Sequence, residues 1–184
     1  MGSAVNVALL GRTHWLLDAG RRLLEAGARV PLVVTFAAED YYRAGAADFE
    51  AFARDAGAAF MLSPDLDDPS IQEALARAGC PVAASVNVPR VLHKPVLNCF
   101  ELGVLNAHAG NLPRYRGNAA PNWAILMGEA RVGLSVHLME AGQLDSGAVV
   151  NKTFFELDDS ADITAVYAWL DQEIPVQLAD AAIA

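Results

Sequence analysis

Apolar runs and amphipathic stretches alternate along most of the chain. Four short apolar runs are predicted strands: residues 5–10, 30–36, 80–86 and 104–107. Three stretches with apolar residues at helical spacing are predicted helices: residues 15–25, the region around 49–56, and 71–78. This alternation is typical of β-α-β units and predicts a mainly parallel sheet covered by helices.

The last third of the chain continues the pattern. A helix, two strands and a final helix are predicted at residues 121–127, 133–138, 148–155 and from 163 onward. Pro175 lies inside the final helix and should kink or split it, because proline removes a backbone hydrogen bond and clashes with the preceding turn. Val166, Trp169 and Leu170 of this helix are expected to be buried within the chain, and a homodimer contact is the alternative.

Composition limits the class of protein. The chain has 184 residues, of which 54% are hydrophobic and 19% charged. This balance favours a packed core over a disordered chain, and the length suits one domain spanning residues 1–184. The net charge is −9 and the basic residues are scattered, so nucleic acid is not an expected partner. There is no signal peptide and no apolar run long enough to span a membrane, so a cytoplasmic protein is expected.

The candidate chemistry lies after the strand predicted at 104–107. Asn106 and His108 are at the carboxyl end of that strand, where open parallel sheets bind ligands, and Asp145 follows in a glycine-bounded loop. The amide can stabilise an oxyanion, the imidazole can carry a proton or a charge, and the carboxylate can accept a proton. Together they indicate acyl transfer to an amine, although Asp145 alone would be read as a turn residue.

The other candidate ligands are weaker. Cys80 and Cys99 are too few for a disulfide framework or a thiolate metal site, and no metal is expected. His137 lies inside a predicted strand, which favours a structural role, with contact with the candidate site as the alternative. The first loop contains Gly11 alone where a dinucleotide fingerprint needs several glycines, so a nicotinamide or flavin cofactor is not expected. Its Arg12 and Thr13 either meet a substrate phosphate at a helix N-terminus or form an ordinary turn.

Several motifs together carry a family resemblance. The residues concerned are 106–121 (NAHAGNLPRYRGNAAP), 123–125, 128–129, 133–137 and 144–147. This series resembles the folate-dependent formyltransferases, a family that includes glycinamide ribonucleotide formyltransferase, the catalytic domain of methionyl-tRNA formyltransferase, and the sugar N-formyltransferases. The resemblance covers about residues 86–180 well and the first half only by pattern.

The resemblance implies an α/β fold with a Rossmann-like, mostly parallel sheet and helices on both faces. It also implies transfer of a formyl group from 10-formyltetrahydrofolate to a primary amine, with no metal. Asn106, His108 and Asp145 fall on the catalytic trio of the family, in which Asn106 and a cationic His108 would hold the oxyanion and Asp145 would take the proton. By position, eight residues are predicted to form the pterin pocket: Val86, Arg90, Val91, Leu92, Val104, Glu140, Gly142 and Leu144.

Two departures concern the acceptor. Many members have serine two places after the histidine, whereas this chain has Gly110 followed by Asn111, and both are candidate substrate residues. The chain stops at Ala184, so no C-terminal domain is expected and a tRNA acceptor is not favoured. A small amine, on an amino-sugar nucleotide or in a siderophore or peptide product, is the leading hypothesis.

Two other functions stay open. The same trio with water as the nucleophile would give a hydrolase that releases formate, or an enzyme that transfers another one-carbon or acyl unit. A binding module without catalysis is the third possibility. The acceptor would be selected by loops that carry no readable motif, at residues 37–46 and 114–118.

Overall fold

The structure is a computed structural model that describes residues 4–63, 65–158 and 161–184. Its centre is a seven-stranded sheet in the order β3-β2-β1-β4-β5-β6-β7. The strands are β1 (Val7–Gly11), β2 (Leu32–Thr35), β3 (Ala59–Leu62), β4 (Val82–Val86), β5 (Gly103–His108), β6 (Arg131–Leu138) and β7 (Val149–Glu156). The first five strands run parallel, and β6 and β7 are antiparallel to their neighbours.

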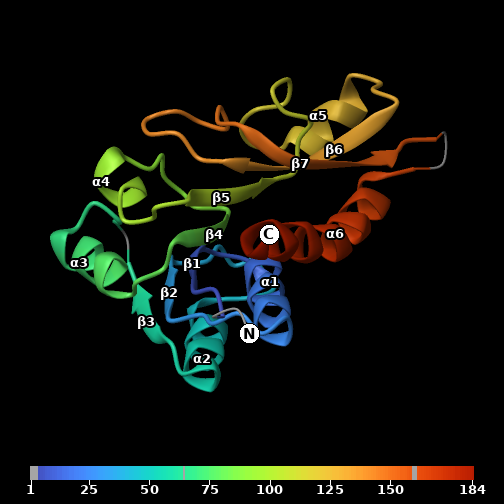
Figure 1. Ribbon diagram of the computed structural model, residues 1–184. Coiled ribbons are helices and arrows are strands. Elements are labelled where there is room, and N and C mark those ends of the chain that lie inside the picture. The colour runs from blue at the N-terminus through green and yellow to red at the C-terminus, as the bar shows by residue number, and fades with distance from the viewer. Residues whose placement is uncertain (1–3, 64, 159–160) are drawn as a thin grey trace.

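Helices cover both faces of this sheet, as the resemblance implied (Figure 1). They are α1 (His14–Glu25), α2 (Ala46–Ala56), α3 (Pro69–Arg77), α4 (Lys94–Leu97), α5 (Ala120–Leu126) and α6 (Ile163–Ile183). One core lies between the sheet and α1, α2 and α6, and a second lies between the sheet and α3 and α4. The strands β1 and β4 are buried along their whole length because both cores press on them.

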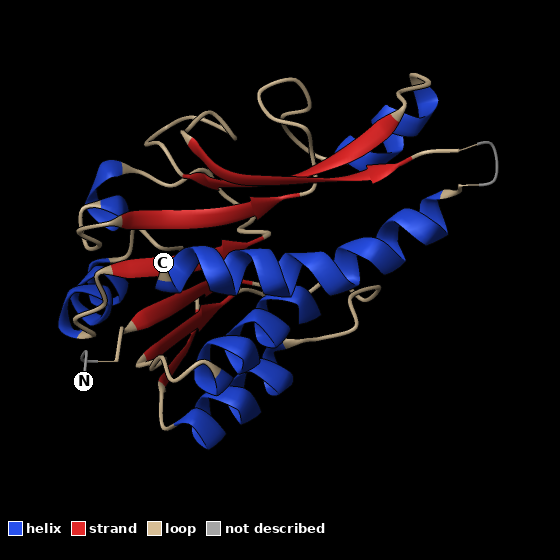
Figure 2. Ribbon diagram, turned by 45° about the vertical axis from the view of Figure 1, so that its right-hand side comes forward, coloured by secondary structure: helices blue, strands red, loops and turns tan. Residues whose placement is uncertain are grey.

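The final helix is unbroken, so the expected split at Pro175 is wrong. Figure 2 shows α6 running along the sheet as one continuous helix. Asp162 caps it by accepting a hydrogen bond from the amide of Ala165 at 2.9 Å. Its buried face includes Leu170, Ile174 and Leu178, and this burial offsets the hydrogen bond that Pro175 removes.

Two elements were missed by the pattern. Strand β3 lies at the sheet edge with a mixed exposed and half-buried pattern, so it shows no clear apolar alternation. Helix α4 has only four residues, with Pro95 in its first turn. It is too short for helical periodicity to appear in the sequence. The sequence also predicts a turn at Ser63-Pro64-Asp65, and Pro64 of this turn lies outside the described residues.

A glycine brings the ends of β1 and β4 together. Gly11 has φ 138°, and a Cβ there would lie 2.0 Å from the carbonyl oxygen of Val86. The next amide, of Arg12, donates to that same carbonyl at 3.0 Å. The carboxyl ends of these central strands therefore form a tight rim on one side of a cleft. Among the described helices, none is long and apolar enough to cross a membrane.

Candidate active site

The three predicted catalytic side chains meet at one wall of a cleft of about 820 Å³. Asn106 and His108 come from the end of β5, and Asp145 comes from the loop that joins β6 to β7. His108 Nδ1 lies 3.4 Å from Asp145 Oδ2, and their side chains are 10% and 8% exposed. The spacing of 37 residues in the chain is thus closed by the antiparallel pairing of β5 with β6.

Sheet register explains the environment of Asn106. Its strand neighbours are Ser85 on β4 and His137 on β6, so all three side chains lie in one row across the sheet. The Ser85 hydroxyl donates to Asn106 Oδ1 at 3.2 Å, and Asn106 Nδ2 is 3.2 Å from His137 Nε2. These two contacts fix the orientation of the amide and leave its second N–H available to a ligand.

The sequence favours a structural role for His137 and leaves contact with the candidate site as the alternative, and the structure shows such a contact. His137 is 1% exposed, its Nδ1 donates to the carbonyl of Leu138 at 2.9 Å, and its Nε2 contacts both Asn106 and Asp145 Oδ1, the latter at 3.5 Å. It therefore joins two of the three predicted catalytic residues. The feature that reveals this contact is the β5–β6 register, which places His137 directly opposite Asn106. That register cannot be derived from one sequence.

His108 has an acceptor at each ring nitrogen. Its Nε2 lies 2.5 Å from the carbonyl oxygen of Tyr115, and its Nδ1 faces the Asp145 carboxylate. Burial lowers the pKa of His108 below the usual value for histidine, although Asp145 and the Tyr115 carbonyl oppose that shift. The two acceptors satisfy an imidazolium better than a neutral ring, so the site is built to tolerate a charge that burial disfavours.

Asp145 is held as an anion. Burial raises the pKa of this carboxyl, but the neighbouring His137 and His108 and the amide of Gly117 outweigh burial and leave the pKa below its usual value. The Gly117 amide donates to Asp145 Oδ2 at 2.8 Å. Asp145 also has φ 47°, a left-handed conformation that aspartate tolerates in turns. The turn interpretation and the site interpretation of this residue are therefore both correct.

The predicted pterin residues divide into two groups. Four of them line the cleft: Val86, Arg90, Val91 and Leu144. The other four are not among its lining residues: Leu92, Val104, Glu140 and Gly142. Leu92 and Val104 are buried in the second core, while the Gly142 amide donates to the Leu92 carbonyl at 2.9 Å and Glu140 accepts from Ser146 at 3.0 Å. The hydrogen bond between Gly142 and Leu92 joins the two loops that carry the lining residues.

The first loop lines the opposite part of the cleft. Arg12 is occupied by the protein itself, because its guanidinium donates to the carbonyls of Asn87 and Ala37 at 3.2 and 3.0 Å. Thr13 has φ 81° and is 3% exposed, and its hydroxyl has no hydrogen-bond partner among the described residues. Of the two, Thr13 is the one with unused hydrogen-bonding capacity beside a helix N-terminus.

Gly110 and Asn111 do not line the cleft. Gly110 packs against His108, since a Cβ at this position would lie 2.4 Å from His108 Nε2 and from the Tyr115 carbonyl oxygen. Asn111 accepts a hydrogen bond from Lys152 Nζ at 3.1 Å. Both candidate substrate residues thus shape the loop behind His108.

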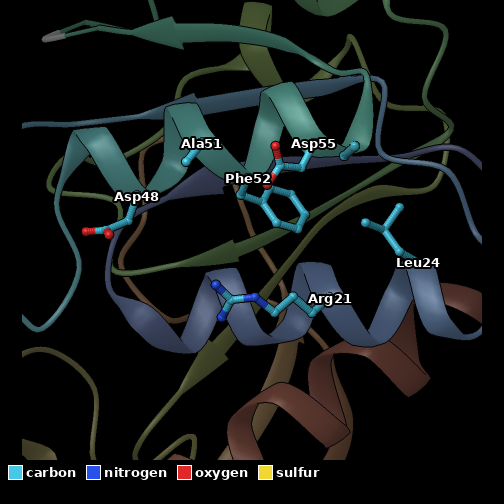
Figure 3. Close-up of a pocket in the computed structure, with 7 residues that line it drawn as sticks. Arg21, Leu24, Asp48, Ala51, Phe52 and Asp55 are labelled. Atoms are coloured by element: carbon cyan, nitrogen blue, oxygen red, sulfur yellow. The ribbon is translucent and has the colours of Figure 1, made fainter.

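A second pocket lies away from these residues, between α1 and α2 (Figure 3). It measures about 310 Å³ and is lined by Arg21, Asp48, Phe52 and Asp55 together with small apolar side chains. None of the predicted site residues lies there. Within the described parts of the chain, no group of three or more histidine, cysteine or carboxylate side chains is placed to hold a metal ion.

Comparisons with known proteins bear on the fold and the family. A methionyl-tRNA formyltransferase from Caldanaerobacter subterraneus subsp. tengcongensis is 27% identical over 168 residues, covering 89% of this chain and 54% of that protein. Glycinamide ribonucleotide transformylase 1 from Symbiobacterium toebii has the same fold, with a TM-score of 0.80 at 21% identity over 100% of this chain and 88% of that one. A formyltetrahydrofolate deformylase from Pseudomonas syringae pv. tomato gives a TM-score of 0.74 at 16% identity over 98% of this chain and 60% of that one.

The chain spans only part of the curated relatives it matches, from 23% to 54% of the length of these proteins. The family model described as formyl transferase nevertheless matches residues 5–178, which is nearly the whole sequence. The chain belongs to the formyl transferase family.

Proposed function

We propose that this protein transfers a formyl group from 10-formyltetrahydrofolate to a primary amine of a small molecule. The observation that carries the proposal is the meeting of Asn106, His108 and Asp145 at one wall of a large cleft. An oriented amide, an imidazole with an acceptor near each ring nitrogen and an ionised carboxylate are the groups that direct acyl transfer needs.

The cleft offers a suitable place for the folate ring. Its lining includes apolar side chains close to the catalytic wall: Val86, Val88, Val91, Met139 and Leu144. These residues would enclose a flat ring, while the backbone of residues 86–91 and 143–145 would meet its polar edge. Bound there, 10-formyltetrahydrofolate supplies an activated formyl carbon beside the trio.

Asn106 would stabilise the charge that develops on the formyl oxygen. Its Nδ2 has one N–H directed to His137 and a second that has no hydrogen-bond partner within residues 4–63, 65–158 and 161–184. A donor fixed in advance costs no reorganisation when the charge appears, and removing such a donor typically costs about 10²–10³-fold in rate. Ser85 and His137 keep the amide in place for this role.

Asp145 would receive the proton that the attacking amine must lose. As the amine nitrogen bonds to the formyl carbon, that nitrogen becomes positively charged, and its proton passes to Asp145 directly or through a water. The bond from the formyl carbon to the folate nitrogen then breaks, and the leaving nitrogen takes a proton from His108, which regains one from the protonated Asp145 beside its Nδ1. The low pKa of Asp145 keeps this carboxylate ionised and ready to accept.

The acceptor is proposed to be a small amine, on an amino-sugar nucleotide or in a siderophore or peptide product. Thr13 is a candidate to contact it, because it lines the cleft beside the N-terminus of α1 and its buried hydroxyl has no hydrogen-bond partner among the described residues. Three expectations from the sequence stay predictions: that nucleic acid is not a partner, that the protein is cytoplasmic, and that one catalytic domain spans residues 1–184.

Hydrolysis of the same folate is the second candidate. The likeness in fold to a formyltetrahydrofolate deformylase favours it, since water can take the place of the amine against the same three residues. The two functions differ only in the nucleophile that the acceptor half of the cleft admits.

Mass spectrometry separates these outcomes. The protein is incubated with 10-formyltetrahydrofolate and a panel of amino-sugar nucleotides, hydroxylated ornithines and simple amines, and an Asn106→Ala variant serves as the control. A formyl mass gain on one amine, lost in the variant, supports the proposal. Formate release with no acylated amine makes hydrolysis the function. Folate binding with neither product would overturn both in favour of a binding role.

A further inference from the structure

The loop at residues 114–117 touches both catalytic partners through its backbone. The carbonyl oxygen of Tyr115 accepts from His108 Nε2 at 2.5 Å, and two residues later the amide of Gly117 donates to Asp145 Oδ2 at 2.8 Å. One short piece of main chain therefore holds the outer ring nitrogen of His108 and one oxygen of Asp145. Its position determines the geometry of the pair.

A carboxylate oxygen helps to hold this loop, together with the amides of Arg114 and Tyr115, which donate to the carbonyl of Asn111 at 3.0 and 3.4 Å. Glu129 Oε1 accepts from the Tyr115 hydroxyl at 2.7 Å and from Arg114 Nη2 at 2.7 Å. The Glu129 side chain is 24% exposed, and its backbone amide donates to the carbonyl of Ala124 in α5 at 3.0 Å. Glu129 thus ties the loop to the turn between α5 and β6, which its own amide joins to α5.

Glu129 does not line the cleft, and it has no direct contact with His108 or Asp145. We propose that Glu129 is a positioning residue for formyl transfer, which holds the Tyr115 carbonyl against His108 and the Gly117 amide against Asp145. This inference rests on the proposed function for its catalytic consequence. Its structural core, the placement of His108, can be measured without any acceptor.

Gly110 is the complementary part of the arrangement. A side chain at this position would occupy the space in which His108 meets the Tyr115 carbonyl, at 2.4 Å from each atom. The contact therefore needs both an inward-held loop and a missing side chain opposite it. The contact between His108 and the Tyr115 carbonyl therefore depends on Glu129 and Gly110 together, as expected of a site whose geometry is set by supporting residues.

The protonation of His108 reports on this contact. The groups that face the imidazole are Asp145, the Tyr115 carbonyl and His137, whose ring centroid is 6.4 Å away. The Tyr115 carbonyl raises the pKa of His108, so its withdrawal would move the His108 midpoint to lower pH. A loss of general stability would not by itself shift the titration of the folded protein.

The test follows the His108 ring resonance by NMR against pH, with the signal assigned from a His108→Asn variant. Glu129→Ala and Tyr115→Phe remove the two sides of the anchor, and Glu129→Gln keeps an acceptor oxygen. Glu73→Ala is the matched control, because it breaks the Glu73–Arg77 pair at 3.2 Å on α3, away from the cleft. All four proteins are compared at a temperature at which each is folded by circular dichroism.

In Glu129→Ala we expect a lower His108 midpoint and a fall in kcat of roughly 10- to 100-fold with little change in KM for the folate, since small displacements of catalytic groups are costly. Tyr115→Phe should lower the His108 midpoint and kcat as well, but by less. Glu129→Gln should retain most of the activity, and Glu73→Ala should match the wild type. Unchanged midpoints in both Glu129→Ala and Tyr115→Phe would overturn the inference. A shifted midpoint in a protein that formylates no amine would support positioning while the proposed function fails.

Discussion

The two walls of the cleft are built differently. On the catalytic wall, formed by β5, β6 and the loops at 114–117 and 142–147, each key side chain is buried and has two or more polar partners. On the acceptor wall, formed by the first loop and residues 37–45, the contacts are exposed ion pairs and aromatic rings. Arg43 is 63% exposed where it pairs with Asp171, and Tyr41 is 78% exposed.

Under the proposed function, this difference would separate chemistry from selectivity. Buried, multiply bonded groups keep one geometry, which a reaction requires, whereas exposed pairs contribute little stability and can rearrange around different ligands. The family resemblance was clear for the catalytic half and only a pattern for the first half. Substitutions on the catalytic wall should therefore change kcat, and those on the acceptor wall should change the KM of the amine.

The largest expected effect is at Asp145. Asp145→Asn removes the carboxylate that accepts the proton of the amine but keeps the side-chain size, so transfer should fall by about 10²–10⁴-fold. Folate affinity, followed by fluorescence titration, should stay close to that of the wild type. Near-normal turnover would exclude Asp145 from proton transfer and would remove the basis of the contrast between the walls.

The next effect is at Gly110, which does not line the cleft. Gly110→Ala places a methyl group 2.4 Å from His108 Nε2, so the imidazole must move away from the Tyr115 carbonyl. We expect a rate loss of roughly 10²-fold and a destabilisation of about 1–3 kcal/mol, measured by turnover and by urea unfolding. If Gly110→Ala turned over like the wild type, the observed position of His108 would be irrelevant to catalysis.

A smaller effect of the other kind is expected at Asp171 on the acceptor wall. Its carboxylate accepts from Trp15 Nε1 at 2.7 Å and pairs with His14 and Arg43 at 2.9 and 2.7 Å, so it ties three segments together. Asp171→Asn should raise the KM of the amine by roughly tenfold, about 1.4 kcal/mol, with little change in kcat. A fall in kcat at unchanged KM would place Asp171 with the catalytic wall instead.

The contrast between the walls also explains what the sequence could predict. Asn106, His108 and Asp145 were found because each lies in a motif at a strand end or in a glycine loop, and their side chains do meet. The site contact of His137 was not favoured because its partner lies across the β5–β6 register, which depends on long-range pairing. Pro175 was misjudged because burial of α6 outweighs the local cost of proline.

The loops were the least predictable part. Glu129 and Gly117 contact the site only because residues 111–118 fold back on β5, and no periodic pattern marks such a path. Leu92 and Val104 were assigned to the pterin pocket by position, but their side chains lie in the core. Strand and helix patterns thus predict which end of the sheet is functional. The direction in which individual loop residues point is seen only in the structure.

The smallest expected effect is a pH dependence of stability that belongs to the catalytic wall. Burial lowers the pKa of His108 in the folded chain, against the opposing influence of Asp145 and Tyr115, while the unfolded imidazole keeps a pKa of about 6.5. Between the two values the unfolded chain binds more protons, so His108 contributes stability that is present above about pH 6.5 and is lost as the pH falls toward the folded value.

Urea unfolding at about pH 7.5 and about pH 5.5 should show a larger loss of unfolding free energy for the wild type than for His108→Asn, because the variant has no group to protonate there. Equal losses in the two proteins would mean that the His108 contacts with Asp145 and Tyr115 cancel the effect of burial, and that the catalytic wall stabilises the imidazolium as well as it does the neutral ring.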